Sequence, residues 1–275
     1  MFELYTQSLA RTTPINITLS PNQLQALADR ASATKSAKKV SRITAFVSYL
    51  VHTYNATVAE AYPEQELLDT VVNTIDYRGD PKFASRGMIG NAAITIQCPS
   101  FTPTPVPREA SAVTLQKDFE ASLAAIASSI QTGNQRSRDP AFLDHYLRFH
   151  SALCRKCYKN HLLQNLFPAS PREISFNSSY VLNWRKAGDL FESPSEYAEA
   201  RKTRFHTTAL MENYIRIFPT NPIPPAEHGN PDWDFELDGG AEAAFMIKKE
   251  LATPFKEKIR KDMESNFSFI VSTRM

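Results

Sequence analysis

The sequence predicts an α/β or α+β fold, in which a mixed β-sheet carries flanking helices. Runs of alternating or β-branched residues are separated by long segments with helical periodicity. The composition, with 42% hydrophobic residues and 31 basic against 29 acidic side chains, is that of a globular protein. The chain shows no internal repeat. These observations together favour one sheet-with-helices domain over a disordered or repetitive chain.

The first predicted elements are a short strand and two helices. Residues 15–19 (INITL) alternate enough to form a strand. Ser20 followed by Pro21 is typical of a helix N-cap with proline in the first helical position. Ser41 is a second candidate N-cap, and apolar residues at helical spacing predict a long buried helix over 42–61.

The middle of the chain predicts two strands, a connector and two more helices. β-branched residues predict a strand within 67–78, and NAAITIQC predicts another over 91–98. Four prolines make residues 99–108 a stiff, exposed connector. Helical spacing then predicts helices over about 110–131 and 139–166.

Beyond Pro171 the pattern becomes β-like again. The expected elements are strands within 178–184 and 207–220, strands in WDFEL and AAFMIKK, and a helix over about 251–264. The segment FSFIV near the end is a candidate for a last strand.

Composition also limits the function. A net charge of +2, without a run of like charges, gives no reason to expect binding to nucleic acid. Only 8 glycines are present, and neither G-x-G-x-x-G nor a phosphate-binding P-loop occurs. No apolar stretch is long enough to span a membrane, and the first ten residues do not resemble a secretory signal. Three cysteines, an odd number, fit reduced thiols in a cytoplasmic protein.

His150, Cys154, Cys157 and His161 are the residue types of a zinc ligand set. Their spacing distributes them along about 16 Å of one predicted helix. A single tetrahedral ion, with bonds of about 2.0 to 2.3 Å, cannot bind all four. We therefore expect no metal site and interpret these residues as part of a packed helix face.

Two further sets of polar residues are weak evidence for a function. Asp76 and Arg78 lie two residues apart at a strand end, so they share a face and are expected to form a structural ion pair. His228 and Asp232 match H-x-x-x-D, a spacing used where a histidine base is paired with a carboxylate. So short a motif arises easily by chance. The residues alone leave the function open.

Three segments resemble the BAHD-type acyltransferases, a family with fungal trichothecene acetyltransferase-like members that is related to chloramphenicol acetyltransferase. KKVSRITAFVSYLVHTYNATVA is similar to the helix after the family's interdomain crossover. NTIDYRGDPKFASRGMIGNAAI is similar to a more specific motif, with matches at Asn73, Asp76, Arg78, Gly90 and Asn91. FNSSYVLNWRKAGDLF is similar to a third, with Trp184 and Asp189 at structural positions, although the motif around Asp189 is shortened.

The resemblance implies one chloramphenicol acetyltransferase-like domain over residues 41–275, preceded over 1–40 by a remnant of the crossover with the first strand and helix. It implies acyl-CoA as co-substrate, no permanently bound cofactor, and a small-molecule alcohol or amine as acceptor. By position, Ser41, Thr44, Gly90 and Asn91 would lie near the CoA arm. Ser41 is equally well explained as a helix cap, and Asn91 as a turn residue.

The resemblance covers only the family's second half. In the family the catalytic H-x-x-x-D-G lies in the first domain, so we expect this chain to be a truncated half without the catalytic histidine, and His228 to be a coincidence. A separate N-terminal half would then be its partner. Two alternatives stay open, namely a CoA-binding pseudoenzyme and an interaction protein whose exposed interdomain face binds a partner or itself.

Overall fold

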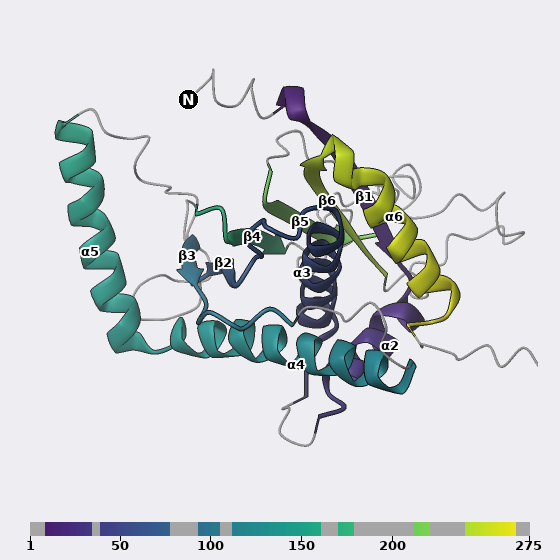
Figure 1. Cartoon of the computed structure of the whole chain (residues 1–275). Helices are drawn as coiled ribbons and strands as arrows, with labels where there is room; N and C mark the ends of the chain where they lie inside the picture. The colour runs from purple at the N-terminus through teal and green to yellow at the C-terminus, as the bar shows by residue number, and fades with distance from the viewer. Residues whose placement is uncertain are drawn as a thin grey trace, which may run out of the picture.

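A mixed β-sheet with helices on one face makes up most of what the structure describes (Figure 1). The computed structural model describes residues 9–34, 39–77, 93–104, 112–160, 170–178, 212–220 and 240–267. The elements in chain order are β1 (Thr12–Leu19), α2 (Pro21–Ala31), α3 (Arg42–Ala61), β2 (Thr70–Asp76), β3 (Ala93–Gln97), α4 (Ala112–Arg136), α5 (Pro140–Lys159), β4 (Glu173–Ser178), β5 (Tyr214–Pro219), β6 (Ala241–Lys248) and α6 (Lys249–Glu264). The predicted fold class is confirmed.

The described strands are ordered β1-β6-β5-β4-β2-β3 across the sheet. β2, β4 and β5 are parallel to one another, whereas β6 is antiparallel to both β1 and β5, and β3 is antiparallel to β2. Parallel neighbours need long crossover connections, which explains the long helical segments between β3 and β4. Since β6 is antiparallel to both β1 and β5, β1 points in the same direction as the three parallel strands.

Two helices begin at the serines that the sequence predicts as caps. Ser20 Oγ accepts from the Gln23 N–H at 3.2 Å, and Gln23 Oε1 accepts from the Ser20 N–H at 2.9 Å. This reciprocal pair is a complete capping box at the start of α2. Ser41 Oγ accepts from the Thr44 N–H at 3.1 Å, and α3 has the predicted length.

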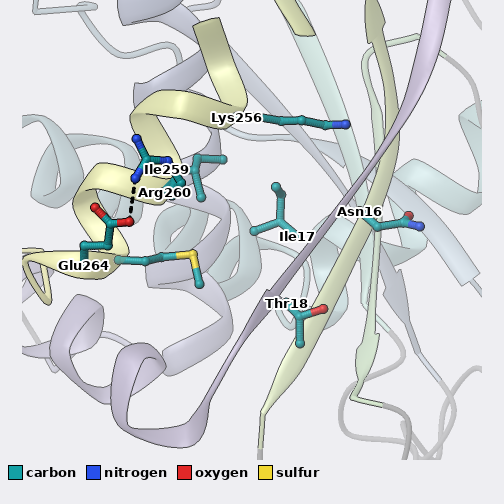
Figure 2. Close-up of a pocket in the computed structure, with 8 residues that line it drawn as sticks. Asn16, Ile17, Thr18, Lys256, Ile259, Arg260 and Glu264 are labelled. Carbon is teal, nitrogen blue, oxygen red and sulfur yellow. Dashed lines mark hydrogen bonds and ion pairs between the residues drawn. The ribbon is translucent and has the colours of Figure 1, made fainter. Parts of the chain in front are cut away.

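An open groove of about 370 Å³ lies between β1 and α6 (Figure 2). α6 follows β6 directly and packs on both β6 and β1. The groove is lined by Asn16, Ile17, Thr18, Lys256, Ile259, Arg260, Met263 and Glu264. Its lining therefore combines the edge of one strand with one side of one helix.

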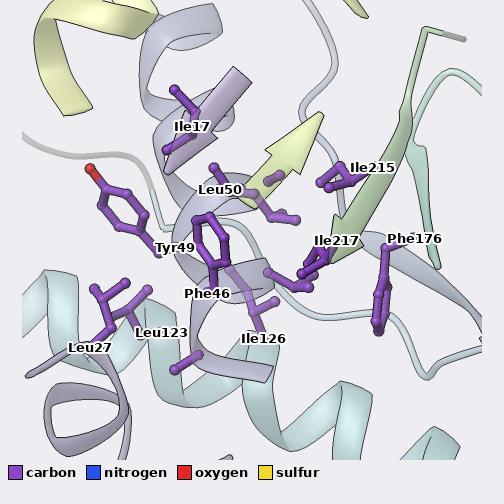
Figure 3. Close-up of a cluster of buried hydrophobic side chains, with 14 of the residues drawn as sticks. Ile17, Leu27, Phe46, Tyr49, Leu50, Leu123, Ile126, Phe176, Ile215 and Ile217 are labelled. Atoms are coloured by element: carbon purple, nitrogen blue, oxygen red, sulfur yellow. The ribbon is translucent and has the colours of Figure 1, made fainter. Parts of the chain in front are cut away.

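α3 lies at the centre of the helical layer and is buried over most of its length. Helices α2, α4 and α6 all contact it. Phe46 and Leu50 of α3 lie in the main core, where side chains from α4 and β5 gather (Figure 3). Burying an apolar side chain of this size contributes about 2 to 3 kcal/mol. The labelled neighbours are Leu27, Leu123, Ile126, Phe176, Ile215 and Ile217.

Polar side chains fix the connection from α3 to β2. Asn55 Nδ2 donates to the Leu68 carbonyl at 2.7 Å, and Asn55 Oδ1 accepts from the Leu68 N–H at 2.8 Å. Asp69 then pairs with the Arg172 side chain, and the Asp69 N–H donates to the Arg172 carbonyl. These contacts align the start of β2 with the start of β4.

A second, smaller core joins α5 to the edge strand β3. Ile94 and Ile96 pack against Leu143 in the first half of α5. Tyr146 Oη donates to the Thr95 carbonyl at 2.7 Å. Within the part of the chain that the structure describes, no helix has the length and hydropathy needed to cross a membrane.

The structure contains a strand that the sequence did not predict, just before the segment 178–184 where one was expected. β4 covers Glu173–Ser178, and residues 179–184 lie outside the described ranges. Ile174 and Phe176 are buried, with polar residues between them. Two apolar positions give a weaker periodic signal than the apolar run after Ser178, so the pattern favoured the later segment.

Several element ends also differ from the prediction: α4 continues to Arg136 instead of ending at about 131. α5 ends at Lys159, where Asn160 forms the C-cap, and not at 166. Phe267 follows α6 in a turn with φ of 57°, and its N–H donates to the Asp262 carbonyl at 2.6 Å. Phe267 therefore lies in the turn after α6 and does not start the expected last strand, whose other residues, 268–271, lie outside the described residues.

Gly133 of α4 touches Cys98 closely enough to test the packing of this helix on the sheet. A Cβ atom at Gly133 would lie 2.6 Å from Cys98 Sγ. Alanine is favoured over glycine in a helix by about 1 kcal/mol. Overpacking costs about 1 to 3 kcal/mol, so it outweighs that gain. We expect Gly133→Ala to lower the free energy of unfolding by about 1 kcal/mol in urea titrations.

Cys98→Ala removes the sulfur that causes this conflict and is the matched control. The double variant should lose about 1 kcal/mol less free energy of unfolding than the two single variants lose together. Strictly additive losses would contradict the contact between Gly133 and Cys98.

Candidate functional site

The carboxyl ends of the parallel strands form one edge of the sheet. β2, β4 and β5 run parallel and β1 points the same way, so Asp76, Ser178, Pro219 and Leu19 lie towards this edge. In open sheets with parallel strands, ligands bind outside the carboxyl ends of the strands. The carboxyl edge of the sheet is therefore the expected position of a ligand site.

Most of the residues that the resemblance singles out belong to segments attached at this edge. Segment 78–92 joins β2 to β3, segment 179–211 follows β4, and segment 221–239 joins β5 to β6. These segments lie outside the described residues and contain five predicted site residues and the two residues of the H-x-x-x-D match: Arg78, Gly90, Asn91, Trp184, Asp189, His228 and Asp232. Their predicted roles stay predictions.

Asp76 is a predicted structural residue that the structure does describe. It is the last residue of β2, lies opposite Ala93 of β3, and is exposed. Its predicted ion pair with Arg78 involves a residue outside the described ranges and stays a prediction.

The first turn of α3 holds the other predicted pair. Ser41 Oγ accepts from the Thr44 N–H at 3.1 Å and donates to Thr44 Oγ1 at 2.8 Å. Ser41 is exposed, whereas Thr44 is buried. The structure therefore brings these two residues together and confirms that Ser41 caps the helix. A contact between them and CoA stays a prediction.

Helix α2 holds this turn of α3 in place. Arg42 Nε donates to Gln25 Oε1 of α2 at 3.0 Å, and the Val40 N–H donates to Ser32 Oγ at 3.1 Å. Because α2 begins directly after the carboxyl end of β1, Gln25 anchors the start of α3 on that side of the sheet. The positive end of a helix dipole, beside the guanidinium of Arg42, favours an anionic group at this position.

Gly240 closes the same edge where three strands meet. A Cβ atom at Gly240 would lie 2.6 Å from the Leu19 carbonyl oxygen and 3.0 Å from Thr220 Cγ2. The Thr220 N–H donates to the Gly240 carbonyl at 3.1 Å. A larger residue would push apart the ends of β1 and β5, so this part of the edge is built rigidly.

His52 of α3 and Ser122 of α4 form a pair with the residue types of a base and a nucleophile. His52 Nδ1 lies 2.9 Å from Ser122 Oγ, within the distance that such catalysis requires. Both side chains are buried, with exposed fractions of 9% and 6%. Burial, aided by the charge of Lys258, lowers the pKa of His52 to about 4. A substrate could reach this pair only if the core opened, so the pair is structural.

Buried Tyr49 of α3 and half-buried Asp262 of α6 form a second polar pair. Tyr49 Oη donates to Asp262 Oδ2 at 2.8 Å. Burial raises the pKa of Asp262 to about 6, although the hydrogen bond from Tyr49 and the charge of Lys258 act in the opposite direction. Phe267 packs edge-on against Tyr49, with ring centroids 5.2 Å apart. The pair therefore ties the last turn of α6 to the central helix.

The pattern H-x3-C-x2-C-x3-H lies mostly on α5. His150, Cys154 and Cys157 are part of one continuous helix, as predicted, and His161 lies outside the described residues. Cys154 Sγ is 3.5 Å from His150 Nδ1. Among the described side chains, no group of three or more His, Cys, Asp or Glu residues is placed to hold a metal ion.

Solved structures match this chain, whereas neither a protein-family model nor a curated protein sequence does. TRI101 of F. graminearum, complexed with coenzyme A and deoxynivalenol, aligns with a TM-score of 0.57 at 16% identity, over 92% of this chain and 48% of its own. TRI101 of F. sporotrichioides, complexed with coenzyme A and T-2, gives 0.56 at 16% identity over 91% and 50%. Vinorine synthase gives 0.51 at 15% identity over 88% and 46%.

Alignment over nearly the whole chain decides the fold. The chain has the fold of the BAHD-type acyltransferases. At 15% to 16% identity the likeness is one of fold alone. The chain spans about half the length of these acyltransferase structures.

Sequence reasoning missed both polar pairs that α3 forms with other helices. Tyr49, His52 and Asn55 all lie in the helix that the sequence predicts as buried. Buried polar groups are nearly always hydrogen-bonded, so their position in that helix signals a need for partners. Their partners Ser122 and Asp262 lie 70 and 213 residues away in sequence, and no local pattern identifies them.

The two buried titratable groups should give opposite contributions to stability between pH 4 and 6. The pKa of His52 is lowered from 6.5, so its contribution is lost as the pH falls towards 4. The pKa of Asp262 is raised from 3.8, so the folded state takes up a proton more readily and loses stability as the pH rises towards 6. In the native protein these two slopes offset each other.

Single variants should expose each slope in urea unfolding measured from pH 4 to 7. Asp262→Asn keeps a polar partner for Tyr49 and should leave a protein that gains about 2 kcal/mol of stability on going from pH 4 to 6. His52→Gln should leave one that loses a similar amount over the same range. Identical pH profiles for the native protein and both variants would show that these groups do not titrate as their burial implies.

Proposed function

We propose that this chain forms one domain of an acyl-CoA-dependent acyltransferase, which transfers an acyl group to a hydroxyl or amine of a small metabolite in the cytoplasm. The observation that carries the proposal is the alignment with TRI101 crystallised with coenzyme A over nearly all of this chain. The three segments of motif resemblance point to the same family. Acyl-CoA is then a co-substrate and not a resident cofactor.

The reaction needs a base at the point where the acceptor meets the thioester. The acceptor oxygen or nitrogen attacks the thioester carbonyl, the C–S bond breaks, and the acceptor's proton passes through the base to the CoA sulfur. A histidine suits both proton transfers because its ordinary pKa of about 6.5 is close to neutral pH. His52 does not fit this role, since it is buried and its pKa is lowered to about 4.

We propose that a second domain supplies the base. The family resemblance gives the catalytic H-x-x-x-D-G motif to the first domain of the whole enzyme. The alignments leave about half of each solved structure unmatched, which is enough for such a domain. We propose that this chain acts with a domain of that kind, whether on the same polypeptide or on a separate one.

The start of α3 is the described position best suited to an anionic part of CoA. Ser41 is exposed at the positive end of a twenty-residue helix, and Arg42 lies beside it. Thr44 is held against Ser41 by a hydrogen bond of 2.8 Å. We propose that this turn, together with Gly90 and Asn91, contacts CoA.

Isothermal titration calorimetry of the full chain with CoA and with acetyl-CoA tests the binding. We expect saturable heat with both compounds, and weaker binding for Ser41→Asp. Aspartate is a good N-cap, so this variant should keep its thermal stability. Its negative charge would repel a phosphate at the helix end and should raise the dissociation constant about tenfold.

Ser20→Asp is the matched control, because Ser20 caps α2 in the same way. It should leave the affinity for CoA unchanged. The absence of saturable heat at millimolar CoA would contradict the proposed co-substrate. Equal affinities for native protein and Ser41→Asp would remove the start of α3 from the CoA site.

A further inference from the structure

The outer edge of β1 and the groove beside it form a surface that the proposed function does not use. We infer that β1 pairs with β1 of a second copy of this chain about a two-fold axis, and that the two α6 helices then pack against each other. The inferred contact is an antiparallel one centred near Ile17. Four features of the described residues support it.

First, β1 is the last strand of the described sheet on its side, and pairs there only with β6. Pro14 has no N–H, and proline in a strand is placed with its nitrogen facing away from the ladder. Since backbone groups alternate in direction along a strand, those of Asn16 and Thr18 face outward together with that of Pro14. These same two residues line the groove.

Second, the geometry of β1 allows a self-complementary pairing. In an antiparallel pair centred on Ile17, Asn16 lies opposite Thr18 of the second copy, and Thr18 lies opposite Asn16. Both outward-facing residues then exchange N–H and C=O bonds with their opposite residue. Pro14 lies outside this central set and does not block it.

Third, α6 runs beside β1 in the same direction. Its first residue follows Lys248, which lies opposite Thr12, and Lys249 Nζ donates to the Ala10 carbonyl at 2.7 Å. α6 packs on both β1 and β6, so it lies above the line between them. Pairing two such edges would bring the α6 axes to about 10 Å apart, which is the normal distance for packed helices.

Fourth, the charges along the groove are complementary under this symmetry. Lys256 and Glu264 lie at the two ends of the groove, and Arg260 lies between them. Each is four residues from the next, which is about 6 Å along α6. Figure 2 shows Lys256 extending towards β1, and Arg260 paired with Glu264 at 2.5 Å. A two-fold axis near Ile17 and Arg260 places Lys256 opposite Glu264 of the second copy, while each Arg260 keeps its own carboxylate partner.

Sedimentation velocity of the full chain, over concentrations from low to several hundred micromolar, tests this inference. We expect a reversible monomer–dimer equilibrium. Thr18→Pro removes one outward N–H from each copy and should abolish the dimer. The circular dichroism spectrum should stay native, because β1 already contains Pro14, whose nitrogen faces the same way as that of residue 18. A sample that stays monomeric throughout would overturn the inference.

Charge reversal tests the orientation without touching the strand. Lys256→Glu and Glu264→Lys should each weaken the dimer about tenfold, because each places like charges opposite one another twice per dimer. The double variant restores opposite charges and should recover the native dissociation constant. Both side chains are exposed, and the Arg260–Glu264 pair that Glu264→Lys removes is also exposed and contributes little, so neither change should affect folding. A dimer unaffected by the single reversals, or not recovered in the double variant, would place the interface elsewhere.

Discussion

The burial of α3 is the constraint on which the rest of the fold depends. From Thr44 to Val58 this helix is enclosed on most sides by α2, α4, α6 and the sheet. A helix enclosed in this way needs partners inside the protein for most of its polar side chains, since an unpaired buried group costs about 1 to 3 kcal/mol. Ser48 and Thr57 bond to carbonyls one turn earlier in the same helix, at 2.8 and 2.7 Å. The larger polar residues need partners on other elements.

Those partners determine how the surrounding elements sit. Asn55 fixes the backbone at Leu68 before β2, His52 binds Ser122 of α4, and Tyr49 binds Asp262 of α6. Each contact is a buried or half-buried hydrogen bond, so each is directional in a way that apolar packing is not. α3 therefore orients one strand and two helices, and through α6 it also fixes the depth of the groove beside β1. The stable core and the proposed functional surfaces depend on the same helix.

The sequence predicted what local chemistry determines and missed what depends on distant partners. Both serine caps, the full length of α3 and the mixed sheet follow from caps and periodicity within a few residues. β4 was missed because Ile174 and Phe176 alone give a weak signal, and their burial is decided by neighbouring strands. Of the predicted site, Ser41 and Thr44 are hydrogen-bonded to each other, since they are three residues apart at the start of one helix. The pairing of Tyr49 with Asp262 depends on the fold itself, so only the need for a partner was visible in advance.

The two proposed surfaces lie in different parts of the sheet and need not interfere. Edge-to-edge pairing extends the sheet along its hydrogen-bonding direction, whereas the candidate CoA position lies towards the carboxyl ends of the strands, where β1 leads into α2. Antiparallel pairing of two copies turns these carboxyl edges in opposite directions. Neither copy then covers the other's edge, and the two sites of a dimer would be well separated. A protein that assembles through β1 can thus still present the start of α3 to a nucleotide and to a second catalytic domain.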